Sequence, residues 1–144
     1  MRKFANALKI AAMLFAAALI FFAVYILPKK PVFSGGESYS FYLGNTSKNC
    51  RVVTTRGNSA PLKKLALKGI SGESATYSSF DWQAYLKSVE GKILFCEELS
   101  DSVNYYCEAA LPYSVQLYGK TVNLHICVKE DGVTIASPII FGGY

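Results

Sequence analysis

A chain of 144 residues with a formal net charge of +5 is long enough for one modest domain and a short additional segment. Its first thirty positions hold five basic residues and no acidic one, whereas from Val32 onward ten Lys and Arg balance ten Asp and Glu. A nucleic-acid-binding protein needs an excess of basic side chains on its folded part, so this balance argues against a nucleic-acid partner.

The first element is an apolar helix. Residues 10–27 read IAAMLFAAALIFFAVYIL and contain no charge. At about 1.5 Å per residue this helix is about 27 Å long, close to the roughly 30 Å hydrocarbon core of a bilayer. The sequence therefore predicts a basic leader over residues 1–9 and a transmembrane signal-anchor over 10–28, with the lipid bilayer as the partner of residues 10–27.

The charges that flank this segment indicate its orientation. Arg2, Lys3 and Lys9 precede it, and Lys29 and Lys30 follow it. Because basic residues accumulate on the cytoplasmic side, we expect a single-pass protein of the cell membrane with a cytoplasmic N-terminus and an extracytoplasmic C-terminal domain.

A cleaved signal peptide is the alternative. Its apolar region is usually roughly 7–15 residues long, shorter than the one here. The first tolerable cleavage site is Val32-Phe33-Ser34, and cleavage near Ser34 would release a secreted soluble binding domain.

Residues 29–36 combine proline, glycine and serine and predict a short tether to a domain over residues 37–144. Alternation of apolar and polar residues, together with β-branched residues, predicts strands in this domain. The expected strands lie at 38–44, 50–55, 73–78, 92–99, 103–110, 113–119, 120–130 and 133–141. Asp131-Gly132 is a hairpin signal between the last two.

Two segments have helical patterns instead. Trp82, Tyr85, Leu86 and Val89 share one helical face, and Ser78 with Asp81 resembles an N-terminal capping box. A shorter helix is expected over residues 59–69. The predicted fold class is α+β: a single transmembrane helix, then a small domain with a mainly antiparallel sheet and one or two helices packed on it.

The four cysteines, Cys50, Cys96, Cys107 and Cys127, all follow the apolar segment, and an even count in an exported domain predicts disulfide bonds. With a turn between Asp101 and Ser102, Cys96 would lie opposite Cys107, which leaves Cys50 to pair with Cys127. The spacings of 46, 11 and 20 residues contain no C-x-x-C pair, so no metal site and no cofactor is predicted.

His125 is the only histidine, and on a strand it shares a face with Cys127. Residues i and i+2 are roughly 6.5–7 Å apart on a strand, a loose arrangement for a nucleophile and its base. We expect His125 on the polar face, pointing to solvent or to a covering helix, and no catalytic residue is predicted.

The chain contains ten tyrosines, which suit recognition surfaces but also have high strand propensity. The sequence therefore favours a membrane-anchored domain with a non-catalytic binding or structural role, in a membrane complex or the cell envelope, with a protein partner. The alternatives are an envelope enzyme that uses His125, or the secreted binding domain.

Overall fold

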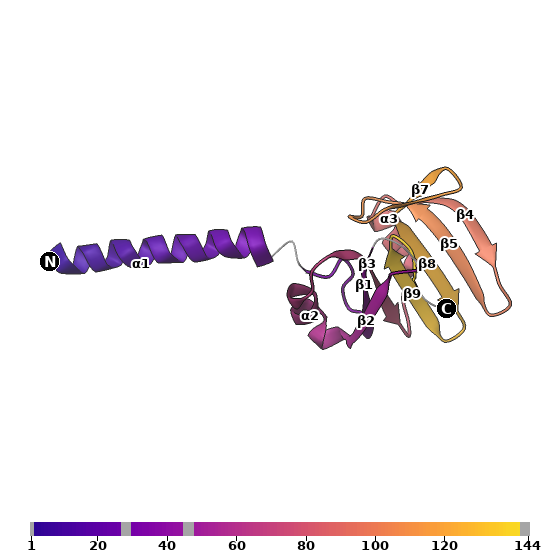
Figure 1. Cartoon of the computed structure of the whole chain (residues 1–144), viewed down its shortest axis with the longest axis horizontal. Helices are drawn as coiled ribbons and strands as arrows, with labels where there is room; N and C mark the ends of the chain where they lie inside the picture. The colour runs from indigo at the N-terminus through magenta and orange to yellow at the C-terminus, as the bar shows by residue number, and fades with distance from the viewer. Residues whose placement is uncertain (1, 27–29, 45–47, 142–144) are drawn as a thin grey trace. The chain divides into compact units, whose positions relative to one another are not determined.

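The computed structural model describes residues 2–26, 30–44 and 48–141, and the chain divides into two compact units, Met1–Lys30 and Pro31–Tyr144 (Figure 1). The first unit is helical: α1 (Arg2–Phe21) continues as the π-helical turn η1 (Phe22–Ile26). The segment Phe4–Tyr25 has 22 residues and a mean hydropathy of 2.4, and it is the one helix of the described residues that is long and apolar enough to span a bilayer. It fits the predicted membrane anchor in length and composition.

The second unit is built on an antiparallel sheet. The described residues form one seven-stranded sheet in the order β2-β1-β3-β9-β8-β5-β4 and a separate two-stranded sheet, β6-β7. The strands are β1 (Ser38–Leu43), β2 (Arg51–Arg56), β3 (Ile70–Tyr77), β4 (Lys92–Glu98), β5 (Ser102–Glu108), β6 (Val115–Leu117), β7 (Lys120–Val122), β8 (Leu124–Lys129) and β9 (Gly132–Ser137). The short helices are α2 (Ala60–Ala66), which follows the 3-10 turn η3 (Gly57–Ser59), and α3 (Trp82–Ser88). The predicted α+β class is confirmed.

The strand expected over residues 120–130 is interrupted at Asn123. Its backbone N–H donates to the carbonyl of Cys107 at 3.1 Å, and its side-chain oxygen accepts the N–H of Ala109 at 2.5 Å. These bonds lie between β7 and β8. The last strand ends at Ser137 rather than at 141, because Pro138 has no N–H to continue the ladder.

Helix α3 presents the predicted apolar face to the sheet. Asp81 is its N-cap and accepts the backbone N–H of Ala84 at 2.9 Å. Ser78, expected as the other half of a capping box, instead bonds the carboxylate of Glu37. Leu86 is part of the core, and Trp82, Tyr85 and Val89 pack against it.

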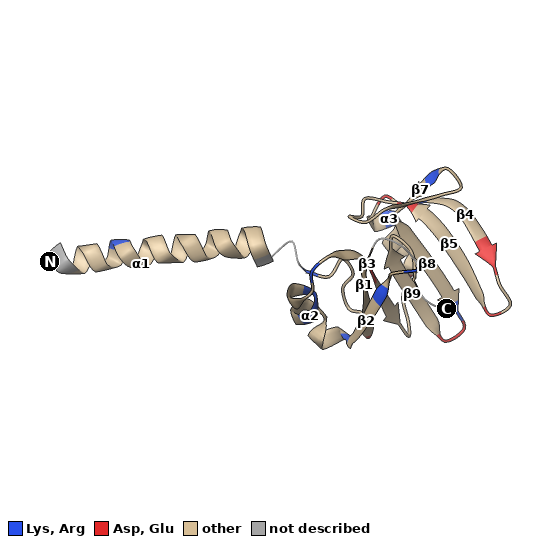
Figure 2. Cartoon of the chain, in the orientation of Figure 1, with Lys and Arg blue, Asp and Glu red and all other residues tan. Residues whose placement is uncertain are grey.

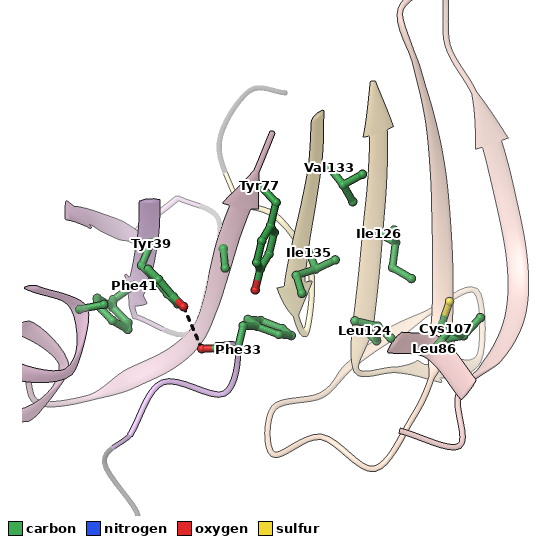
Figure 3. Close-up of a cluster of buried hydrophobic side chains, with 12 residues drawn as sticks. Phe33, Tyr39, Phe41, Tyr77, Leu86, Cys107, Leu124, Ile126, Val133 and Ile135 are labelled. Carbon is green, nitrogen blue, oxygen red and sulfur yellow. Dashed lines mark hydrogen bonds between the residues drawn. The ribbon is translucent and has the colours of Figure 1, made fainter. Parts of the chain in front are cut away.

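The core lies on the face of the sheet that α2 and α3 cover (Figure 3). Side chains from five strands, both helices and the segment before β1 meet there. They are Phe33, Tyr39, Phe41, Ala60, Ala75, Tyr77, Leu86, Cys107, Leu124, Ile126, Val133 and Ile135.

The segment between the apolar helix and the sheet is built into this core. Phe33 is only 2% exposed. The hydroxyl of Tyr39 donates to the carbonyl of Phe33 at 3.0 Å, as Figure 3 shows, and the hydroxyl of Tyr77 donates to the carbonyl of Ser34 at 2.9 Å. Part of the segment predicted as a tether is therefore fixed within the domain.

Glu73 holds this segment and α2 together. Its side chain is fully buried on β3; one carboxylate oxygen accepts the backbone N–H of Val32, and the other lies 2.5 Å from the ammonium nitrogen of Lys64. Burial, together with the charge of Glu73, raises the pKa of Tyr85 and of Tyr113 to about 12. Removing one partner of a buried ion pair costs about 3–5 kcal/mol, so the pair fixes which face of α2 points inward.

Replacement of Phe33 by Ala tests whether the segment belongs to the core. Truncation of a buried Phe costs about 3–5 kcal/mol, and urea unfolding of the full chain in detergent micelles should show a loss of that size. The control is Tyr118→Ala, because Tyr118 is 91% exposed, and a surface change of this kind costs about 0.5 kcal/mol or less. Equal small losses would mean that the segment is a free tether.

Candidate functional site

We call the face of the sheet opposite the helices the open face. It carries two continuous rows of side chains. Each row contains one residue from every strand, because the cross-strand partners continue in register from β2 to β4. The first row is Thr54, Ser40, Ser74, Ala136, His125, Tyr106 and Phe95. The second row is Arg56, Ser38, Thr76, Thr134, Cys127, Asn104 and Glu97.

The half of the open face over β1, β3 and β9 is rich in hydroxyl groups. Thr76 and Thr134 are hydrogen-bonded across the strands at 3.2 Å, and the hydroxyl of Tyr42 donates to that of Ser74 at 2.8 Å. Burial raises the pKa of Tyr42, so this hydroxyl stays protonated at neutral pH. A hollow of about 540 Å³ lies over these groups, with Lys129 also in its wall.

The half over β5 and β4 is aromatic. Phe95 stacks on Tyr106 with ring centroids 4.7 Å apart, and Tyr106 stacks on His125 at 4.5 Å. Tyr118, in the turn between β6 and β7, meets the Phe95 ring edge-on at 5.7 Å. These rings line a second hollow of about 410 Å³, and Glu97 adds a carboxylate that accepts the Tyr106 hydroxyl at 3.3 Å.

Residues 138–141 fold back over the open face and separate the two hollows. Ile140 lines both hollows, and its backbone N–H donates to Nδ1 of His125 at 3.2 Å. The ring of Phe141 packs edge-on against Tyr42 at 5.1 Å. The C-terminal segment therefore covers His125 and gives each hollow one of its walls.

His125 is not at the surface, which corrects the prediction that it points to solvent or to a covering helix. It is 0% exposed. Because Nδ1 accepts a hydrogen bond from Ile140, the ring proton is on Nε2, which donates to Oδ1 of Asn104 at 3.0 Å. Burial lowers the pKa of His125 to about 4. The imidazole is therefore neutral and held at both nitrogens, an arrangement suited to packing rather than to proton transfer.

The predicted disulfide bonds are absent, and all four cysteines are free thiols. The hairpin closes with the N–H of Leu99 on the carbonyl of Ser102, so its turn lies at Ser100 and Asp101, one position earlier than expected. Cys96 consequently lies opposite Tyr105.

The strand register and the strand order keep the other predicted partners apart as well. A bulge between Ile93 and Phe95 puts Cys107 opposite Ile93. For Cys50 and Cys127, the strand order puts β1, β3 and β9 between β2 and β8. The distance between β2 and β8 is thus four inter-strand spacings of about 4.8 Å each. It far exceeds the Cα separation of about 7 Å that a disulfide allows. Burial raises the pKa of Cys107 to about 12 and also raises that of Cys127.

Within residues 2–26, 30–44 and 48–141, no group of three or more His, Cys, Asp or Glu side chains is placed to hold a metal ion. Comparison with family models, with curated proteins and with solved structures finds no match.

Sequence reasoning missed the buried pair of Lys64 and Glu73. A signal was present for Glu73, since it has the same strand parity as Ala75 and Tyr77, which both face the core. Lys64 gave no such signal, because a short helix with two adjacent lysines does not show which one turns inward.

Because His125 is neutral in the folded protein, we expect the protein to lose stability in acid. Its folded-state pKa lies below its ordinary value of 6.5, so between pH 6.5 and about 4 the unfolded chain binds a proton that the folded chain does not. The free energy of unfolding should therefore decrease as the pH falls through this window, by about 3 kcal/mol in total.

The His125→Gln variant lacks this titration and should show a smaller decrease, measured by urea unfolding at pH 7 and pH 4.5. Comparing the two proteins cancels the contribution of the carboxylates, which both share. The same pH dependence in both would contradict a buried, neutral His125.

Proposed function

We propose that this chain is a single-pass membrane protein whose second unit binds a protein partner on the extracytoplasmic side, through the open face and without catalysis. The observation that carries the proposal is the contrast between the two faces of the sheet. One face is closed by α2 and α3 over the core, and the other presents two hollows that no helix of the described residues covers. Hollows lined by apolar and aromatic side chains with a few polar groups are typical of small-molecule sites, and they can also receive the anchoring side chains of a protein partner.

The proposed orientation rests on the flanking charges, with three basic residues before the uncharged stretch 10–27 and two after it. The cysteines, free in the structure, add no support to it.

The composition of the open face favours a protein partner. Tyr118 is 91% exposed beside the aromatic hollow. Tyrosine provides a large apolar area at low entropic cost and keeps its hydroxyl in water, which is why it is enriched at protein interfaces. The hydroxyl-rich half, with Thr76 and Thr134, offers donors and acceptors to the polar groups of the same partner.

Both alternatives have less support. An enzyme would need His125 as an accessible base, but this side chain is covered by Ile140, and burial lowers its pKa to about 4, which makes it a weak base at neutral pH. A secreted domain released after Ser34 would lack Val32 and Phe33, and with them the N–H on Glu73 and a core ring.

Site-specific photo-crosslinking tests the open face. A benzoyl-phenylalanine at Tyr118, carried by the full chain in its native membrane, should form an adduct with one defined protein. The same residue at Gln83, which is exposed on α3 on the other side of the sheet, should not.

Matched substitutions by arginine then separate an effect on binding from an effect on folding. Thr76→Arg, on the exposed hydroxyl-rich half, should abolish the adduct formed at Tyr118, whereas Gln83→Arg should preserve it. An adduct from Gln83 alone, or an adduct at Tyr118 that Thr76→Arg leaves unchanged, would contradict the proposal.

A further inference from the structure

Helix α2 has the opposite polarity from an ordinary surface helix. It buries Ala60 and Lys64, and it exposes Leu62 and Leu65 by 74% and 38%. A helix on a soluble domain turns its apolar stripe to the core and its charged residues to water. Here a lysine points inward and two leucines three positions apart point outward, so the outward side is the apolar one.

This orientation is fixed by the interior of the domain. The ammonium group of Lys64 lies 2.5 Å from the Glu73 carboxylate and 5.9 Å from the centroid of the Tyr113 ring. A rotation of α2 that hid the leucines would remove Lys64 from its buried counter-ion. The exposure of Leu62 and Leu65 is therefore a consequence of the fold and not of a loosely packed helix.

The same carboxylate holds α2 next to the point where the chain enters the domain. Val32 donates its N–H to Glu73, and Ile26 is the last described residue of the apolar helix. Six Cα–Cα steps separate Ile26 from Val32, and a chain of this length spans about 22 Å at most. A short chain therefore joins the segment that Glu73 holds beside α2 to the last described residue of the apolar helix.

The charges around α2 complement an anionic surface (Figure 2). Residues 38–72 contain no Asp or Glu. Lys63 and Lys68 are exposed at α2, and Arg51 and Arg56 are exposed on the neighbouring edge strand β2. Among the described residues no ion pair involves these four side chains. Acidic side chains gather instead on and beside β4, at the opposite edge of the sheet, and include Glu97, Glu98 and Asp101.

We propose that α2 is a membrane-surface contact, with Leu62 and Leu65 inserted at the boundary between headgroups and acyl chains and Lys63 and Lys68 on the phosphates of anionic lipids. Exposed leucines flanked by lysines are the residues that interfacial helices use, because lysine can extend its ammonium group to the headgroups while its methylenes stay in the apolar layer. Two leucines are a small contact on their own. The membrane anchor makes the contact intramolecular, and this inference rests on that part of the proposed function.

Quenching by brominated lipid measures the contact in the full chain. A Leu62→Trp variant in a Trp82→Phe background is reconstituted in phosphatidylcholine vesicles that contain brominated acyl chains, with and without 30% phosphatidylglycerol. The matched control is Leu99→Trp in the same background, since Leu99 is also exposed, by 42%, and lies beside β4. We expect several-fold stronger quenching at position 62 than at 99, a further increase with phosphatidylglycerol, and a decrease when Lys63 and Lys68 are both replaced by Glu.

Flotation of the vesicles separates this inference from the anchor. Full-length protein that floats with the vesicles but is quenched no more at position 62 than at 99 would overturn the membrane contact and leave the anchor intact. Failure to float would overturn the anchor and this inference with it. A blue-shifted emission of the Leu62→Trp variant that depends on the protein-to-lipid ratio and not on bromination would assign this face to a contact between copies of the chain, and would also overturn the proposal.

Discussion

One buried carboxylate connects the parts of this structure that lie far apart in the sequence. Glu73, on β3 within the sheet, accepts the N–H of Val32 and pairs with Lys64 of α2. A buried carboxylate is tolerated only when both of its oxygens have hydrogen-bonding or ionic partners. The Glu73 side chain therefore requires Val32 and Lys64 at the same time. The segment before β1 is thereby held against the core, and α2 is held with its leucines outward. The unusual polarity of α2 follows from this interaction.

The two faces of the sheet differ because the alternation of the strands assigns them different residues. Apolar side chains such as Ile126 and Ile135 alternate with polar or aromatic ones, and the antiparallel register carries each set across the whole sheet. The helices cover the first set. The second set is covered only in part, by residues 138–141, and the bond from Ile140 to His125 fixes where that cover lies. A face with two hollows and a dividing segment is the result, and the proposed binding function depends on it.

Local patterns were sufficient to predict much of this fold from the sequence. Strand alternation located the strands of the sheet, and the spacing of Trp82, Tyr85 and Leu86 gave the inward face of α3, because both signals depend on neighbours in the chain. The predictions that were wrong depended on tertiary structure. The register that separates Cys96 from Cys107 depends on a turn one position earlier and on a bulge, neither of which the pattern specifies. The parity of His125 was correct, but its burial comes from the C-terminal segment, whose return over the sheet no local signal in the sequence indicates.

The central claim is that the Lys64–Glu73 pair fixes the segment before β1 and α2, and a double-mutant cycle tests it most directly. Lys64→Met, Glu73→Gln and the double variant are unfolded by urea as full chains in micelles. Each single variant leaves one buried group without its partner and should lose about 3–5 kcal/mol. The double variant leaves no unpaired charge, so its loss should be well below the sum of the two single losses. Small single losses that add up in the double variant would show that the pair is not coupled, and would contradict this account.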